Sequence, residues 1–92
     1  MSTLEFDVTK GVVIFSSDYC PYCIRAKNLL AQKGVAFEEI RVDGATEVRA
    51  KMAEMAGKTS VPQIWISGQH VGGCDDLFSL EDRGELDTML QP

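Results

Sequence analysis

Apolar residues gather in short runs along this 92-residue chain, and the spacing within each run indicates its conformation. Residues 12–15 are uniformly apolar between Gly11 and Ser16, which is typical of a strand buried on both faces. From Pro21 the apolar side chains recur at intervals of three and four residues as far as Gly34, which predicts a helix with a glycine stop. Pro21 suits the first turn of this helix, because its missing N–H would have no partner within the helix.

The middle of the chain predicts a second strand and a second helix. Residues 35–42 are rich in β-branched and aromatic side chains and are followed by an Asp-Gly pair, which is typical of a strand closed by a turn. Thr46 is the expected N-cap of the next helix, which carries its apolar side chains on one face and ends at Gly57.

A hairpin and a last helix are expected in the final third of the chain. Residues 63–66 predict a third strand, and a Ser-Gly-Gln turn leads into a short fourth strand at residues 70–71. Asp75 or Asp76 is the expected cap of a last helix that continues to Leu90.

The order of these elements predicts the class of fold. A βαβ unit followed by a hairpin and a covering helix predicts an α/β protein with a four-stranded mixed central sheet flanked by helices. The length fits a single domain over residues 1–92. Residues 1–10 carry the weakest pattern, and we expect them to form an extra turn or to be loosely ordered.

Charge and composition narrow the possible partners. Nine basic and 14 acidic residues give a net charge of −5, which argues against a nucleic-acid or anionic-membrane surface. Residues 1–10 do not resemble a secretory signal, and no apolar run approaches the roughly 18 residues of a membrane span. We therefore expect a cytoplasmic protein, in which three cysteines are more often catalytic or metal-binding than structural.

Two of the cysteines form a Cys-Pro-Tyr-Cys motif at the predicted start of the first helix. There Cys20 would meet unpaired backbone N–H groups and the positive end of the helix dipole, which stabilise a thiolate. Cys23 lies one turn further on, within reach of a disulfide. A stabilised thiolate is also a good leaving group, so the motif favours a pair that is repeatedly oxidised and reduced.

Zinc binding is the main alternative for these cysteines. Cys20, Cys23, His70 and Cys74 have the donor types of a Cys₃His site. The separation between the two halves of this set exceeds the roughly 15 to 20 residues of a zinc ribbon, which disfavours zinc.

Three other features are compatible with a redox function, and each has a simpler explanation. Pro62 directly precedes a predicted strand, where it would form either a cis peptide or an ordinary trans strand start. The Gly-Gly-Cys-Asp-Asp segment at 72–76 would hold a carboxylate on its N–H groups or simply cap a helix. Tyr22 would cover a bound thiol or merely face solvent.

Taken together, "CPYC" at 20–23, "SVPQIWI" at 60–66 and "GGCDDL" at 72–77 resemble a dithiol glutaredoxin. The later segment "LFSLEDRGELDTML" is similar to the short bacterial glutaredoxin 3 type. The resemblance implies a thioredoxin-like fold and the glutathione-dependent reduction of protein disulfides and glutathione mixed disulfides.

The resemblance also implies roles for individual residues. Cys20 would be the nucleophile and Cys23 the resolving thiol of a redox-active disulfide. Residues expected to contact glutathione are Tyr22, Lys58, Val61, Pro62, Cys74, Asp75 and Asp76. Val61, before a cis-proline at Pro62, would pair its backbone with the cysteinyl part, and Cys74 and Asp75 would hold the γ-glutamyl end. A small packing residue is an equally good interpretation of Cys74.

The sequence departs from many relatives in one position before the motif. These relatives carry a lysine three residues before the first cysteine, where it assists thiolate formation and meets a glutathione carboxylate. Here that residue is Ser17, followed by Asp18. The helix terminus would then supply most of the thiolate stabilisation, and Lys58 or Arg25 would meet the carboxylate.

The expected partners follow from the same resemblance. Glutathione is the expected reductant and co-substrate, no metal is expected, and the protein is expected to be a monomer. Its clients would be disulfide-bonded or glutathionylated proteins, with ribonucleotide reductase as one candidate. A redoxin reduced by thioredoxin reductase is one alternative, which the 72–76 segment disfavours. An iron–sulfur carrier that bridges two chains is another, which Pro21 disfavours.

Overall fold

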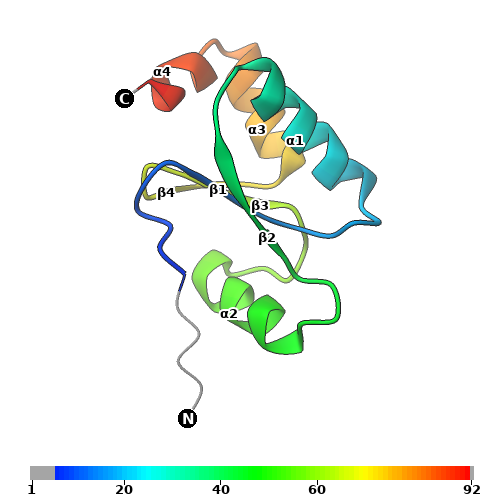
Figure 1. Ribbon diagram of the computed structural model, residues 1–92. Coiled ribbons are helices and arrows are strands. Elements are labelled where there is room, and N and C mark those ends of the chain that lie inside the picture. The colour runs from blue at the N-terminus through cyan, green and yellow to red at the C-terminus, as the bar shows by residue number, and fades with distance from the viewer. Residues whose placement is uncertain (1–5, 92) are drawn as a thin grey trace.

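The structure, a computed structural model, describes residues 6–91 and has the predicted mixed sheet. Its elements in chain order are β1 (Val12–Ser16), α1 (Pro21–Gln32), β2 (Phe37–Arg41), α2 (Thr46–Ala56), β3 (Gln63–Ile66), β4 (Gln69–Gly72), α3 (Cys74–Asp82) and α4 (Leu86–Leu90) (Figure 1). Among these helices none is both long and apolar enough to cross a membrane.

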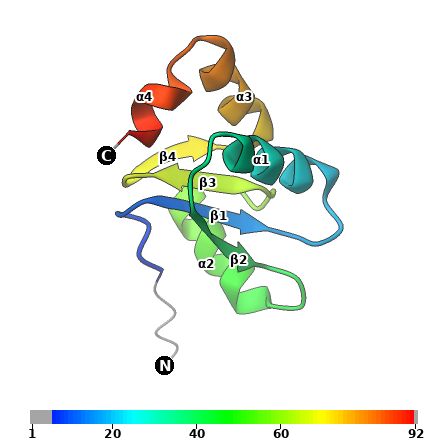
Figure 2. The same cartoon turned by 45° about the horizontal axis from the view of Figure 1, so that its top comes forward.

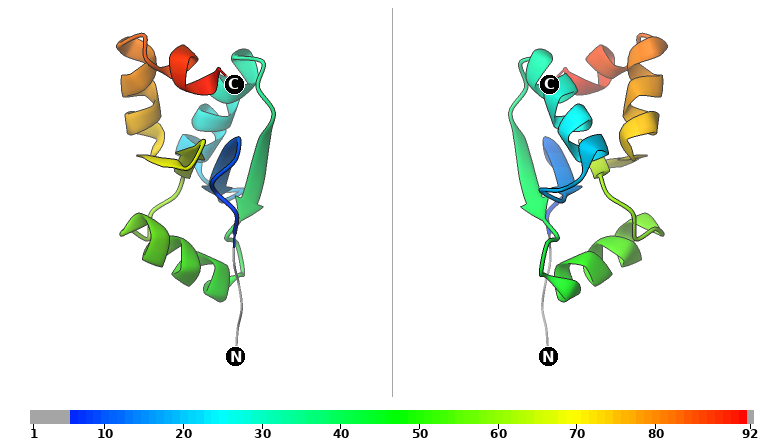
Figure 3. Two further views of the ribbon diagram at one scale, coloured as in Figure 1. Left: turned by 90° about the vertical axis from the view of Figure 1, so that its left-hand side faces the viewer. Right: turned by 90° about the vertical axis from the view of Figure 1, so that its right-hand side faces the viewer.

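The four strands lie in the order β2-β1-β3-β4, with β1 parallel to β2 and antiparallel to β3. Helices α1, α3 and α4 cover one face of the sheet, and α2 covers the other (Figures 2 and 3). The central position of β1 explains its sequence, because a strand covered on both faces has no polar side to present. Three of the five residues of β2, at one edge of the sheet, are charged: Glu38, Glu39 and Arg41.

Alternate residues of the central strand belong to two separate hydrophobic cores. Val12 and Ile14 pack with the buried side chains of α1, α3 and α4. Val13 and Phe15 pack with Met52 of α2 and with Trp65 of β3. This alternation is the period of two expected of a strand, and it fixes β1 between the two helical layers.

Two predicted caps were wrong. Ala45, not Thr46, is the N-cap of α2, and it makes no side-chain capping bond. Thr46 is the first residue of the helix itself. Gly73, not Asp75 or Asp76, is the N-cap residue of α3, although Asp76 does close the helix start by accepting the N–H of Gly73. In both cases the sequence offered a good capping side chain one to three residues too late, because the preceding turn determines where the helical backbone begins.

The single last helix predicted to reach Leu90 is in fact two helices. Gly84, with a φ of 72°, separates α3 from α4. Its N–H donates to the carbonyl of Glu81, and the N–H of Glu85 donates to that of Leu80, so the end of α3 is closed by backbone bonds. The apolar spacing continues across the break because both helices cover the same face of the sheet.

The prediction for residues 1–10 lies partly outside the described residues, which begin at Phe6. The ring of Phe6 meets Phe15 edge-on, with ring centres 5.3 Å apart. Phe6 and Val8 are partly buried against the core on the α2 side of the sheet. Residues 6–8 are therefore held against the domain by apolar contacts.

Candidate functional site

The Cys-Pro-Tyr-Cys motif lies where β1 has ended and α1 begins. Cys20 is the N-cap of α1, and Pro21 occupies the first helical position, as its ring geometry favours. The backbone N–H of Cys23 donates to Cys20 Sγ at 3.2 Å. The sulfur therefore takes the place that a serine or aspartate oxygen takes in an ordinary helix cap, and a negative charge on it is stabilised by this N–H.

A second contact joins Cys20 to a distant segment of the chain. Its Sγ lies 3.7 Å from the carbonyl oxygen of Val61, to which the thiol donates. The Val61–Pro62 peptide bond is cis, one of the two arrangements considered for this proline. Because β1 and β3 are paired neighbours, the helix start and the segment before β3 meet at one end of the sheet.

Cys23 is a different kind of thiol. Its side chain is fully buried, and burial, with a further contribution from its hydrogen bond to the Cys20 side chain, raises the pKa of Cys23 to about 12. Cys20 is partly exposed, so one sulfur of the pair is open to reagents and the other is protonated behind it. Burial also raises the pKa of Cys74, the third cysteine.

Iodoacetamide should therefore modify only Cys20 in the folded protein between pH 6 and 9. With a pKa of about 12, Cys23 is ionised to about one part in a thousand at pH 9, and its burial blocks access as well. Peptide mass spectrometry after timed labelling tests this, and labelling in urea, where all three cysteines should react, is the control. A second cysteine labelled at a rate close to that of Cys20 would contradict the assignment.

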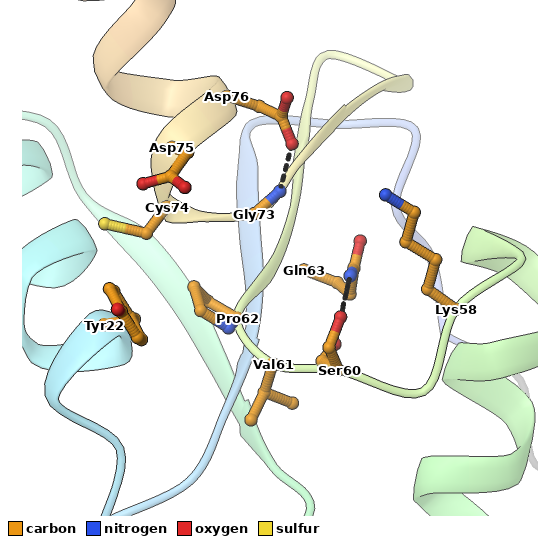
Figure 4. A pocket seen from close by; sticks show the side chains of 10 residues that line it. All are labelled: Tyr22, Lys58, Ser60, Val61, Pro62, Gln63, Gly73, Cys74, Asp75 and Asp76. Carbon is orange, nitrogen blue, oxygen red and sulfur yellow. Dashed lines mark hydrogen bonds between the residues drawn. The ribbon is translucent and has the colours of Figure 1, made fainter.

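A groove of about 200 Å³ adjoins the Cys20 contact at Val61. Its lining residues are Tyr22, Lys58, Ser60, Val61, Pro62, Gln63, Gly73, Cys74, Asp75 and Asp76 (Figure 4). Three segments meet here: the first turn of α1, the loop before β3, and the turn between β4 and α3. In Figure 4, Lys58 lies at one end of the groove, and Tyr22 and Cys74 lie at the other.

All seven residues that the sequence predicted for glutathione contacts line this groove. Three others, Ser60, Gln63 and Gly73, were missed, although each is adjacent to a predicted residue in the chain. Arg25, the alternative to Lys58, is not among the lining residues; its guanidinium lies over the ring of Phe78, 5.0 Å from its centre.

The start of α3 forms the wall of the groove opposite the cis-proline. Asp76 Oδ2 accepts the N–H of Gly73 at 2.9 Å, so this carboxylate closes the turn that precedes the helix. Gly72 has a φ of 115°, and a Cβ at this position would lie 2.3 Å from Asp76 Oδ2. The N–H groups of residues 74–76 have no acceptor within the helix, which makes this wall suited to a carboxylate.

The segment before the motif is tied to the loop after β2. Ser17 Oγ donates to Asp43 Oδ1 at 2.5 Å, and the N–H of Asp18 donates to Asp43 Oδ2 at 2.7 Å. These bonds lower the pKa of the Asp43 carboxyl, the Asp18 N–H contributing most. Arg41 pairs with Asp18 at 2.9 Å. The residue in place of the lysine thus anchors the loop that carries Cys20.

The four residues of the zinc alternative are not brought together. His70 Nε2 lies 2.8 Å from Gln63 Oε1, and its ring lies over Trp65 with ring centres 4.6 Å apart. Over residues 6–91 no three His, Cys, Asp or Glu side chains are grouped as metal ligands.

Comparisons with a family model, with curated sequences and with solved structures all find glutaredoxins. Residues 12–71 match the family model described as Glutaredoxin. The chain is 61% identical over 79 residues to "Glutaredoxin" of Pseudomonas aeruginosa, covering 86% of this chain and 94% of that one. It is 51% identical over 81 residues to "Glutaredoxin 3" of Escherichia coli K12, covering 88% and 98%. Among solved structures, a buckwheat glutaredoxin–glutathione complex matches with a TM-score of 0.83 and 34% identity, over 90% of this chain and 79% of that one.

Proposed function

The chain belongs to the glutaredoxin family of glutathione-dependent thiol–disulfide oxidoreductases, and we propose that Cys20 is the residue on which its catalytic cycle begins. The observation that carries this proposal is the position of its sulfur. Cys20 Sγ accepts an N–H at the start of α1 and contacts Val61 at the edge of the groove. Its sulfur thus has a backbone N–H as a hydrogen-bond donor and lies beside the space in which a substrate would lie.

With a glutathionylated protein the cycle needs one cysteine. The Cys20 thiolate attacks the glutathione sulfur, so that a new Cys20–glutathione disulfide forms and the protein thiolate leaves. A second glutathione, as thiolate, then attacks the glutathione sulfur of this mixed disulfide. Glutathione disulfide leaves and the Cys20 thiolate is restored. One free glutathione is consumed for each client, because the other half of the glutathione disulfide is the glutathione that the client carried.

With a protein disulfide the cycle uses both cysteines. Cys20 attacks one sulfur of the client, and the client's other sulfur leaves as a thiolate that takes up a proton. Cys23 then transfers its proton to solvent and attacks Cys20, which forms the Cys20–Cys23 disulfide and releases the second client thiolate. Two glutathione molecules reduce this disulfide in turn. The buried, protonated state of Cys23 suits this order, because it becomes nucleophilic only as its proton is removed.

Glutathione is proposed to occupy the groove beside Val61. The backbone of Val61 would pair with its cysteinyl residue, and the N–H groups of Cys74 and Asp75 would hold the γ-glutamyl carboxylate. Lys58 at the other end would meet the glycine carboxylate, and Tyr22 would cover the sulfur. The complex of a buckwheat relative with glutathione supports this ligand.

The decisive experiment compares two reductants. Wild-type protein is supplied with a glutathione mixed disulfide, glutathione and glutathione reductase, and separately with insulin and thioredoxin reductase, while NADPH oxidation is followed. Turnover is expected only with the glutathione system. Turnover with thioredoxin reductase and none with glutathione would overturn the proposed reductant and the glutathione groove with it.

Lys58→Gln should raise the KM for the glutathione mixed disulfide about fivefold and leave kcat unchanged. An exposed ion pair is worth about 1 kcal/mol, which corresponds to that factor. Lys51→Gln is the matched control, because Lys51 lies on α2 outside the groove and, within residues 6–91, pairs with Glu54 alone. Added salt should raise the KM of the wild type more than that of Lys58→Gln. Equal KM values for the wild type and Lys58→Gln would remove Lys58 from the site.

The proposal extends to the setting in which the protein works. We propose a cytoplasmic monomer with a single domain over residues 1–92. Its clients would be disulfide-bonded or glutathionylated proteins, ribonucleotide reductase among the candidates. The acidic net charge of −5 is consistent with protein and small-molecule partners and not with nucleic acid.

A further inference from the structure

Gln63, a groove residue that the sequence did not single out, is the largest buried polar side chain in the site. It follows the cis-proline, and only 2% of its surface is exposed. Its Nε2 donates to the carbonyl oxygen of Ser60 at 3.0 Å and lies 3.4 Å from Ser60 Oγ (Figure 4). The amide therefore bridges the loop that precedes it, across the Val61–Pro62 bond.

The orientation of this amide is determined by its partners. Since Nε2 faces an acceptor at Ser60, Oε1 must be the atom that faces His70. Oε1 accepts there, so His70 Nε2 carries a hydrogen and donates at 2.8 Å. The His70 ring is held in turn against Trp65 of β3. His70, Gln63 and Ser60 thus form a chain of hydrogen bonds that runs from β4 to the loop before β3.

This chain fixes the plane of one peptide group. The carbonyl of Ser60 and the N–H of Val61 belong to the same planar unit, and in a trans peptide they point in opposite directions. With its carbonyl held by Gln63, the unit must turn the Val61 N–H away from Gln63. The Val61 carbonyl, which belongs to the next peptide unit, is the group that contacts Cys20 Sγ.

We propose that Gln63 is a positioning residue for glutathione: it holds the Ser60–Val61 peptide so that the Val61 N–H is presented to the cysteinyl backbone of the ligand, and His70 holds Gln63 in that orientation. The proposal rests on the proposed function, because it names what orients the glutathione site. Neither side chain is required to touch the reacting sulfurs.

The test compares one probe that has peptide groups with one that has none. Reduced protein is mixed with glutathione disulfide or with 4,4′-dithiodipyridine, and the second-order rate constant of Cys20 is measured for each. Gln63→Leu should slow the reaction with glutathione disulfide about tenfold, the factor that corresponds to about 1.4 kcal/mol, and leave that with dithiodipyridine within about twofold. Gln69→Leu, the same change at an exposed position of β4, is the control and should alter neither rate constant.

A second variant keeps the test decisive if Gln63→Leu does not fold. His70→Phe retains an aromatic ring against Trp65 and removes the hydrogen bond to Gln63, so it should slow glutathione disulfide selectively, by about threefold. In the double variant the loss should equal that of Gln63→Leu alone, because His70 acts through Gln63.

The outcomes separate this proposal from the proposed function. Equal losses with both probes, no loss with either, or losses that multiply in the double variant would overturn the role of Gln63. Inactivity of the wild type with glutathione in the coupled assay would instead overturn the proposed function, whatever the variants do.

Discussion

Cys20→Ser should reduce turnover of a glutathione mixed disulfide to the uncatalysed rate, whereas Cys23→Ser should retain at least about a third of it. A serine hydroxyl is not ionised at neutral pH and cannot form the mixed disulfide, while Cys23 takes no part when glutathione itself releases Cys20. With a protein disulfide such as insulin, both variants should be inactive. The buried position of Cys23 behind Cys20 gives this asymmetry its physical basis.

The same coupled assay measures both variants, with circular dichroism to confirm that each is folded. Removal of the Cys23 thiol leaves its backbone N–H in place, so the bond to Cys20 Sγ should survive in Cys23→Ser. A folded Cys23→Ser that fails with the mixed disulfide would show that Cys23 is needed in every cycle. Activity of Cys20→Ser would mean that another cysteine is the nucleophile.

Gly72→Ala should lower the free energy of unfolding by about 3 kcal/mol and raise the KM for glutathione. The φ of 115° is strained for any side chain, which costs on the order of 1–3 kcal/mol. A Cβ would also lie 2.3 Å from Asp76 Oδ2, so the carboxylate would have to release the Gly73 N–H. Urea unfolding followed by circular dichroism measures the first effect, and the coupled assay measures the second.

Gly34→Ala separates the two causes of this loss. Gly34 also has a positive φ, 73°, but a Cβ there would meet nothing within 4 Å. It should therefore cost only the backbone strain of the left-handed region, about 1 kcal/mol, and leave the KM unchanged. If Gly72→Ala costs no more than Gly34→Ala, the Asp76 carboxylate moves aside freely and does not hold the wall of the groove.

The sequence predicted the strands of the sheet, and the three motifs that meet at the groove, better than it predicted where the helices begin and end. A buried central strand is visible in the sequence as four apolar residues in succession, and the start of α1 is visible as a proline at its first position. The N-cap of α2 at Ala45 has no such pattern, because the turn that begins at Val42 determines its position and Ala45 has no capping side chain. The break at Gly84 was hidden because the residues on both sides pack on the same face of the sheet.

In the candidate site, too, the sequence revealed the motifs, which are local patterns, but not the contacts that join one motif to another. Residues such as Cys20 and Asp75 were found because their motifs are local, and the resemblance to a family grouped those motifs into one groove. Gln63 was missed, because what distinguishes it is the direction of its amide toward Ser60 and His70. The bond from Ser17 to Asp43 spans 26 residues and leaves no local pattern either.

The charged strand at one edge of the sheet has a consequence for how the protein behaves at high concentration. An edge strand offers unpaired backbone groups on which a second molecule can extend the sheet, and such extension leads to aggregates. In a parallel, in-register stack, Glu38, Glu39 and Arg41 of β2 would each lie beside the same charge of the incoming β2. The charges of this edge therefore oppose fibril-like stacking, and one of them, Arg41, also pairs with Asp18 just before the cysteine motif.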